Sequence, residues 1–406
     1  MNEIARRCRI AGTLVAALLA ACSEPAPVAR VPPGPPGPVE RFLTPAPAPV
    51  SVPAIEAAER LVRGGVERER FPGAALAIGN RGLIQKVEGF GKTSWADDAP
   101  AVSGDSTQYD LASLTKVVAT TAAVMALVED GKIELDAPVQ RYLPRFTGGS
   151  KARVTIRHLL THTAGARAGA SDIGEETSRA QVLRYLVSRP LTLVPGEHVL
   201  YSDVGFVILW AAAESAAGEP LANYLRRRVW GPLEMHSTRV GVPTGCAACA
   251  PTLHLEEHDS AYTGGSYDEV ARRLDGLAGN AGAFSTGRDL ARFAAMIANE
   301  GRLGNVRVFA RRTVRAFTRP QPGTGTRALG WEVYCREGVV PDQRECGEVY
   351  AFGHTGVTGT SLWINPDSRT WVVLLANRTY LPRLDVDMQA FRRRVYSAAI
   401  ADSTGS

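Results

Sequence analysis

Lysine is scarce in this chain of 406 residues. Only five lysines stand among its 46 lysine and arginine residues, at positions 86, 92, 116, 132 and 151. An ordinary surface charge here is an arginine, so each lysine invites a specific explanation. Unlike a guanidinium, an amine gives up its proton when its surroundings lower its pKa. Lys116 follows Ser113 by three residues in the stretch "DLASLTKVVATTAAV", which raises the question of what chemistry needs an amine there.

Other absences exclude several classes of function. The chain has no G-x-S-x-G sequence, which argues against an α/β-hydrolase. Its basic runs lack interleaved aromatic residues and its formal net charge is only +5, so we expect no nucleic-acid partner. His254–His258 reads "HLEEH" and matches a metallopeptidase pattern, but Pro251 and the pair Gly264-Gly265 leave little room for the helix that this pattern needs. We therefore expect no metal and no other cofactor, and keep a zinc metallopeptidase only as a remote alternative.

The N-terminus lacks an apolar run long enough to span a bilayer. Its apolar run covers only residues 10–21 and follows three arginines, so residues 1–21 are predicted to be a signal peptide. It ends in Leu19-Ala-Ala-Cys22, which resembles a bacterial lipobox. That resemblance implies lipidation of Cys22, and Ser23 after it suggests the outer membrane. An ordinary signal peptide with a chance cysteine is the alternative.

The rest of the chain divides by composition. Residues 22–53 are rich in proline and alanine and are predicted to be an extended tether. Residues 54–401 form the predicted folded domain, and residues 402–406 a tail. After loss of Cys8 with the signal, Cys335 and Cys346 could close a disulfide in an oxidising compartment. Cys246-Ala-Ala-Cys249 has redox or zinc spacing, but no second such pair follows, so a local disulfide or two free thiols remain open.

The predicted architecture is α+β. Strands at 71–78 and 83–90 flank the turn Gly79-Asn-Arg-Gly82, and strands at 328–335, 359–366 and 370–378 lie near the other end. Helices are predicted at 54–69 and 385–400, and a mostly helical subdomain at 113–318. We expect an antiparallel sheet built from N- and C-terminal segments and flanked by helices.

Ser113 and Lys116 carry the first sign of chemistry. Residues three apart share a helix face, so the hydroxyl and the amine can point the same way. A low-dielectric pocket would lower the lysine pKa and let the amine act as a base toward the hydroxyl. Alone, S-x-x-K is a weak signal, because a capping serine and a surface lysine give the same pattern.

Two further motifs follow in order, Tyr201-Ser-Asp203 and His354-Thr355-Gly356. With "SLTK" they resemble the penicillin-recognising serine hydrolases: class C β-lactamases, low-molecular-weight penicillin-binding proteins and related esterases. The resemblance covers about 54–400, including "VTIRHLLTHTAG" and "GNAGAFSTGRDLARFAAM". It implies the β-lactamase/transpeptidase-like fold, with the last motif on an edge strand along which the substrate would lie.

The same resemblance implies roles for single residues. Ser113 would form an acyl-enzyme, Lys116 and Tyr201 would share its proton, and the backbone N–H groups of Ser113 and Val357 would form the oxyanion hole. Asp203, His354, Thr355 and Gly356 would bind substrate. His158 and His162, by contrast, are expected to make structural hydrogen bonds.

Two positions depart from the best-known members of that group. Asp203 stands where an asparagine is usual, and an ionised carboxylate cannot donate a hydrogen bond to a substrate carbonyl. If Asp203 pairs with Lys116, it keeps the lysine charged, which favours Tyr201 as the base. His354 stands where strong β-lactamases place lysine, and a mostly neutral imidazole holds a substrate carboxylate less firmly.

The sequence therefore predicts a lipid-anchored serine hydrolase on the periplasmic face of the outer membrane. Its substrate would be a small ester, a β-lactam or a peptidoglycan peptide, and its oligomeric state is open. A non-catalytic cell-wall-binding or scaffold lipoprotein is the alternative.

Overall fold

The fold is organised around one antiparallel sheet. The computed structural model describes residues 49–170, 172–174, 178–241, 246–253, 265–335, 346, 348–380, 382–383 and 387–400. The sheet has six strands in the order β2-β1-β11-β10-β9-β8: β1 (Gly73–Asn80), β2 (Leu83–Gly91), β8 (Glu332–Cys335), β9 (Val349–Thr355), β10 (Ser361–Ile364) and β11 (Thr370–Ala376). β1 pairs with β11 from Ala74↔Ala376 to Asn80↔Thr370, so segments from the two ends of the domain meet in the centre. The predicted α+β class and the origin of its sheet are confirmed.

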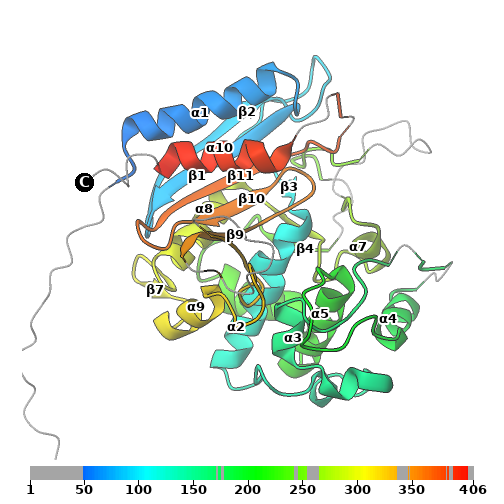
Figure 1. Cartoon of the computed structure of the whole chain (residues 1–406). Helices are drawn as coiled ribbons and strands as arrows, with labels where there is room; N and C mark the ends of the chain where they lie inside the picture. The colour runs from blue at the N-terminus through cyan, green and yellow to red at the C-terminus, as the bar shows by residue number, and fades with distance from the viewer. Residues whose placement is uncertain are drawn as a thin grey trace, which may run out of the picture. The chain divides into compact units, whose positions relative to one another are not determined.

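Helices cover both faces of this sheet. α1 (Val52–Glu67) and α10 (Met388–Ile400) lie side by side on one face (Figure 1), and α8 (Gly287–Ala298) packs on the other. β1 explains this arrangement, because all eight of its residues are buried. Leu76 and Ile78 join the core beneath α1 and α10, whereas Ala75 and Ala77 join the core on the α8 side. Alternate side chains of one strand thus tie the two layers together.

The middle of the chain is mostly helical, as predicted. The remaining helices are η1 (Ala112–Leu114), η2 (Lys116–Thr121), α2 (Ala122–Glu129), η3 (Val139–Arg141), η4 (Gly149–Arg153), α3 (Ile156–Leu160), α4 (Arg179–Ser188), α5 (Asp203–Ala217), α6 (Leu221–Leu225), η5 (Arg226–Trp230), α7 (Glu269–Arg273) and α9 (Arg311–Thr318). Short strands that we did not predict also occur there: β3 (Tyr109–Asp110), β4 (Arg239–Val240), β5 (Ala283–Ser285), β6 (Arg302–Leu303) and β7 (Val306–Arg307). Strands of two or three residues are too short to show a period-two pattern.

The helical run that follows Ser113 forms part of the core. Among the described residues, Ala112–Glu129 is the one helical stretch with the length and composition of a membrane span, and 83% of that window is buried inside the fold. It passes from a 3₁₀ turn (η1) through a π-helical segment (η2) to the α-helix α2. Gly131, with φ +68°, follows its end, and glycine is the residue that takes this conformation most readily at a helix C-terminus.

One expectation about the sheet is wrong. We expected the His354-Thr355-Gly356 motif on an edge strand, but β8 lies outside β9 and is itself the edge. The two strands pair from Glu332↔Gly353 to Cys335↔Val349, so the ladder stops just before the motif. His354 and Thr355 pair only with β10. The motif therefore lies where β9 extends beyond its outer neighbour.

Candidate active site

Ser113 lies at the end of a constrained turn. β3 enters it, and Ala112, just before the serine, has φ +46°, a left-handed conformation that costs energy for any residue with a Cβ. The carboxylate of Asp110 stabilises the turn, because its Oδ1 accepts a hydrogen bond from the Ala112 N–H at 2.9 Å and its Oδ2 one from the Tyr267 N–H at 2.6 Å. Burial raises the pKa of Asp110 to about 6. The serine is thus positioned by backbone strain and a buried acid.

Lys116 is completely buried beneath Ser113. Its Nζ lies 3.1 Å from Ser113 Oγ, 2.6 Å from Asp203 Oδ1 and 3.1 Å from the carbonyl oxygen of Asn280. Burial alone would lower the pKa of this amine, but the neighbouring Tyr201 and Asp203 outweigh burial, and the pKa of Lys116 is raised. The side chain is therefore an ammonium whose three N–H groups all have acceptors.

Tyr201 lies over the same ammonium. The Lys116 Nζ is 4.8 Å from the centroid of the Tyr201 ring, and the Arg327 guanidinium is 5.4 Å from it. The His162 ring stacks against Tyr201 at 4.5 Å between centroids. His162 Nδ1 accepts a hydrogen bond from the Ser202 N–H at 3.0 Å, and burial holds the His162 pKa well below its usual value. The phenol thus has two cations and a neutral imidazole as neighbours.

His354 is buried and neutral. Burial, together with the charges of Lys116 and Arg327, lowers its pKa to about 3. Its Nδ1 hydrogen-bonds to the Thr355 carbonyl oxygen at 2.8 Å, so Nδ1 carries the proton, and the buried Nε2 has no hydrogen-bond partner. This imidazole cannot supply the positive charge that a lysine would supply here.

The turn after β9 is held against the turn that carries Ser113. Thr358 Oγ1 donates to the Asp110 carbonyl at 2.8 Å, and Thr360 Oγ1 donates to the Leu111 carbonyl at 2.9 Å. A Cβ on Gly356 would lie 2.2 Å from Thr360 Oγ1 and 2.3 Å from the Leu111 oxygen, so only glycine allows this approach. Among the described residues, none accepts a hydrogen bond from the Val357 N–H, which remains available for a substrate oxygen.

These residues surround a cavity of about 450 Å³. Its lining includes Ser113, Tyr201, His354, Thr355, Gly356 and Val357, and also Arg327, Arg378 and Arg392. Lys116 lies beneath this lining in contact with Ser113, and Asp203 pairs with Lys116. A half-buried serine beside a buried ammonium, a phenol and an open N–H form an arrangement suited to acyl transfer.

A comparison with protein-family models agrees with this geometry. The model described as Beta-lactamase matches residues 58–397, most of the chain. The chain belongs to the Beta-lactamase family. It is accordingly a serine hydrolase of that family.

Curated relatives and solved structures extend the comparison. The Salmonella agona (strain SL483) protein named "Putative D-alanyl-D-alanine carboxypeptidase" is 31% identical over 335 residues, which cover 75% of this chain and 77% of that protein. The beta-lactamase/D-alanine carboxypeptidase from Pseudomonas syringae has a TM-score of 0.67 at 21% identity, covering 87% of this chain and 99% of that one. The class C beta lactamase from Rhodobacter sphaeroides has a TM-score of 0.67 at 20% identity, covering 86% and 100%. The two structures show the same fold.

The Beta-lactamase family resemblance did not point to every residue of the site. Arg327 gave no signal, because one arginine among many in a loop carries no motif. Asp110 and Asn280 lie within stretches that we quoted, but their contacts with Ala112 and Lys116 depend on the tertiary fold. His158 and His162 make the structural hydrogen bonds that we expected: His158 caps α3, and His162 accepts from Ser202.

The four described cysteines do not line this cavity. Cys335 and Cys346 form a disulfide with Cα atoms 5.6 Å apart, and Cys246 and Cys249 form a second, with Cα atoms 5.3 Å apart. The latter resolves the alternatives left open for that pair. Cys22, the tether and the sequence His254–His258 lie outside the described residues. The part of the chain that is described contains no cluster of three or more metal-ligating side chains.

Proposed function

We propose that the protein is a carboxypeptidase of the D-alanyl-D-alanine type that acts through an acyl-enzyme on Ser113. Ser113 Oγ would attack the carbonyl carbon of the penultimate D-alanine and lose its proton to Tyr201. The C–N bond would break, and the terminal D-alanine would leave as its amine takes that proton. Water would then hydrolyse the ester on Ser113. The names of the curated relatives and the layout of the cavity support this proposal.

The charge of Lys116 supports a path in which the Ser113 proton passes to Tyr201. Because Lys116 is charged and donates a hydrogen bond to Ser113 Oγ, it does not accept the serine proton in this state. The Tyr201 ring lies 4.8 Å from the same ammonium and lines the cavity with Ser113. Tyr201 is therefore the proposed base, and Lys116 donates a hydrogen bond to the serine oxygen.

The observation that carries the substrate class is the position of Arg327. This guanidinium lines the cavity beside Tyr201 and His354, and no carboxylate in the described part of the chain pairs with it. Arg378 lines the same cavity, and its Nε donates to the Val357 carbonyl at 2.8 Å. Since His354 is neutral, the cations of the lining are these two arginines and Arg392, which outnumber the lining carboxylates Glu332 and Asp387. A peptide with a free C-terminal carboxylate fits this arrangement better than a neutral ester does.

The proposed location comes from the N-terminal sequence. A short apolar run that ends in Cys22, followed by a proline-rich tether, supports a lipid anchor at the outer membrane with the domain in the periplasm. Peptidoglycan peptides occupy that compartment, so location and substrate class agree.

The test is release of D-alanine from an N-acylated tripeptide that ends in D-Ala-D-Ala, by the full chain purified in detergent. We expect turnover in the wild type, none in Ser113→Ala, and a fall of at least 100-fold in Tyr201→Phe. Arg327→Gln should lower kcat/KM for the free peptide by about 10- to 100-fold and leave that for its C-terminal methyl ester nearly unchanged. Arg153→Gln, an exposed position outside the cavity, is the matched control.

The outcomes separate the possible functions. Cleavage of the ester but not of the free peptide, unaffected by Arg327→Gln, would indicate an esterase. Intact mass spectrometry would then show whether a penicillin acylates Ser113. If neither substrate is cleaved and no acyl group is found, the results favour the non-catalytic cell-wall-binding or scaffold alternative.

A further inference from the structure

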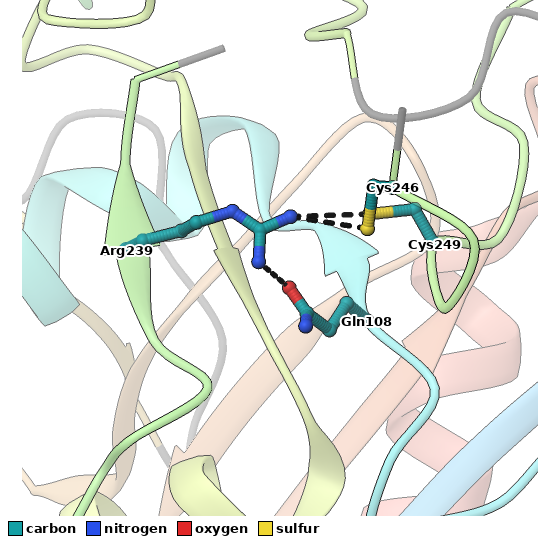
Figure 2. The surroundings of a disulfide bond; sticks show 4 residues. All are labelled: Gln108, Arg239, Cys246 and Cys249. Carbon is teal, nitrogen blue, oxygen red and sulfur yellow. Dashed lines mark hydrogen bonds between the residues drawn. A yellow bond between two sulfur atoms is a disulfide. The ribbon is translucent and has the colours of Figure 1, made fainter. Parts of the chain in front are cut away.

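The disulfide Cys246–Cys249 lies against a half-buried cation. Arg239, on β4, points its guanidinium at both sulfur atoms (Figure 2), with Nη2 at 3.1 Å from Cys246 Sγ and 3.3 Å from Cys249 Sγ. The other Nη donates to the side-chain oxygen of Gln108. No carboxylate in the described ranges forms an ion pair with Arg239, and its buried Nε has no hydrogen-bond partner.

Within the described ranges, this guanidinium has no anion beside it. Burial lowers the pKa of Arg239, as expected for a cation held among neutral groups. The sulfurs of a disulfide are only weak acceptors, and the amide of Gln108 is neutral. A thiolate on either cysteine would provide the missing negative charge at hydrogen-bond distance. The surroundings therefore favour the reduced, ionised state of this pair.

We propose that Cys246–Cys249 is a thiol–disulfide exchange site, opened in the folded protein by a dithiol reductant, with Arg239 as the counter-ion of the thiolate that forms. The site is separate from the serine chemistry, and the inference does not depend on the proposed function.

The accessibility of the two sulfurs sets the direction of attack. Cys246 is half-buried and is followed by two exposed alanines, whereas Cys249 is only 4% exposed. A thiolate of the reductant would attack Cys246 Sγ, and the S–S electron pair would leave on Cys249 Sγ beside Arg239. The second thiol of the reductant would then break the mixed disulfide and free Cys246. Two electrons pass to the protein, and the reductant becomes a disulfide.

The second disulfide provides an internal comparison. Cys335 lies on β8 and Cys346 just before β9, and the described residues place no guanidinium in hydrogen-bond contact with either sulfur. Among the described residues, a cation that could stabilise a thiolate therefore lies only at Cys246–Cys249. The two bonds should respond differently to the same reductant.

The test equilibrates the full chain with graded ratios of reduced to oxidised dithiothreitol at pH 7. Free thiols are trapped by N-ethylmaleimide and both disulfides are quantified by peptide mass spectrometry, while circular dichroism confirms that the protein stays folded. We expect Cys246–Cys249 to open at a ratio at least tenfold lower than Cys335–Cys346 does. Arg239→Gln should raise the ratio needed for Cys246–Cys249 at least tenfold, and Arg239→Lys by less. The ratio for Cys335–Cys346 should stay unchanged in both variants.

Arg153→Gln, at an exposed position, serves as the matched control and should behave as the wild type. The proposal is overturned if both disulfides of the wild type open together, or if Cys246–Cys249 opens only as the circular dichroism signal is lost. It is also overturned if Arg239→Gln leaves unchanged, or lowers, the ratio of reduced to oxidised dithiothreitol that opens Cys246–Cys249. If the glutamine variant does not fold, the same criterion applies to Arg239→Lys.

Discussion

Lys116 and Asp203 form an ion pair, with Nζ and Oδ1 2.6 Å apart. The pair is asymmetric, because the lysine side chain is fully buried whereas the aspartate side chain is 29% exposed. The buried ammonium of Lys116 therefore depends on its counter-ion more than the partly solvated carboxylate of Asp203 does. An asparagine at position 203 would keep the shape of the site but would leave a buried ammonium without its counter-ion.

The first prediction follows from that asymmetry. Asp203→Asn should destabilise the folded protein by about 2 to 4 kcal/mol at pH 7, because an uncompensated charge is left in a buried position. In the wild type the folded-state pKa of Lys116 lies above 10.5, so the stabilisation is present below that pH and lost as the pH rises through the raised pKa. In the variant, burial without the carboxylate lowers the pKa of Lys116. The unfolded chain then binds more protons, and stability rises with pH.

The difference in free energy of unfolding between the wild type and Asp203→Asn should therefore shrink from pH 7 to pH 10. Urea unfolding at each pH measures this difference. Asp136→Asn is the matched control, since Asp136 forms an ion pair with Arg157 but its side chain is exposed. That variant should differ little from the wild type. A gap for Asp203→Asn that stays constant over this pH range would show that Asp203 does not hold the charge of Lys116.

The second prediction concerns the approach of Gly356 to the turn that carries Ser113. Gly356→Ala should lower kcat/KM for any acyl substrate by at least about 100-fold, because the new methyl group would push the Val357 N–H away from Ser113. The free energy of unfolding should fall by about 1 to 3 kcal/mol, a cost typical of forcing a group into a packed position. Steady-state kinetics and urea unfolding measure the two effects separately.

Gly169→Ala is the control, because a Cβ there has no neighbour within 4 Å. It should leave both quantities close to the wild-type values. Full activity in Gly356→Ala would show that the turn after β9 adjusts without displacing the Val357 N–H, and that this N–H does not bind the oxyanion.

The architecture could be predicted from the sequence because its signals are local. β1 and β2 carry apolar residues on both sides of a turn, and β10 and β11 repeat that pattern near the other end of the domain. The three motifs likewise indicate Ser113, Tyr201 and His354, which line one cavity, and Lys116, which contacts Ser113. Where a signal was local, the prediction and the structure agree.

The features that were missed depend on long-range contacts. The positive φ of Ala112 occurs in a turn where Asp110 accepts a hydrogen bond from Ala112 and another from Thr358, and no sequence pattern records a positive φ at alanine. The role of Arg327 depends on a loop folding over Tyr201. The position of β8 outside β9 could not be predicted either, because four residues at an edge resemble any short extended segment.

The third prediction concerns His354 and acid. Its folded-state pKa is about 3, whereas the unfolded chain has the ordinary value of 6.5, so between these limits the unfolded state binds a proton that the folded state does not. The stability of the wild type should therefore fall by up to about 1.4 kcal/mol for each pH unit below 6. His354→Asn keeps a donor for the Thr355 carbonyl but has no titratable group, so its stability should fall less steeply between pH 6 and pH 4. Urea unfolding at half-unit intervals of pH measures both slopes.

His236→Asn, at an exposed position, is the matched control and should follow the wild type. Equal slopes for His354→Asn and the wild type would mean that the imidazole takes up its proton in the folded protein, and would restore His354 as a cation for the substrate carboxylate.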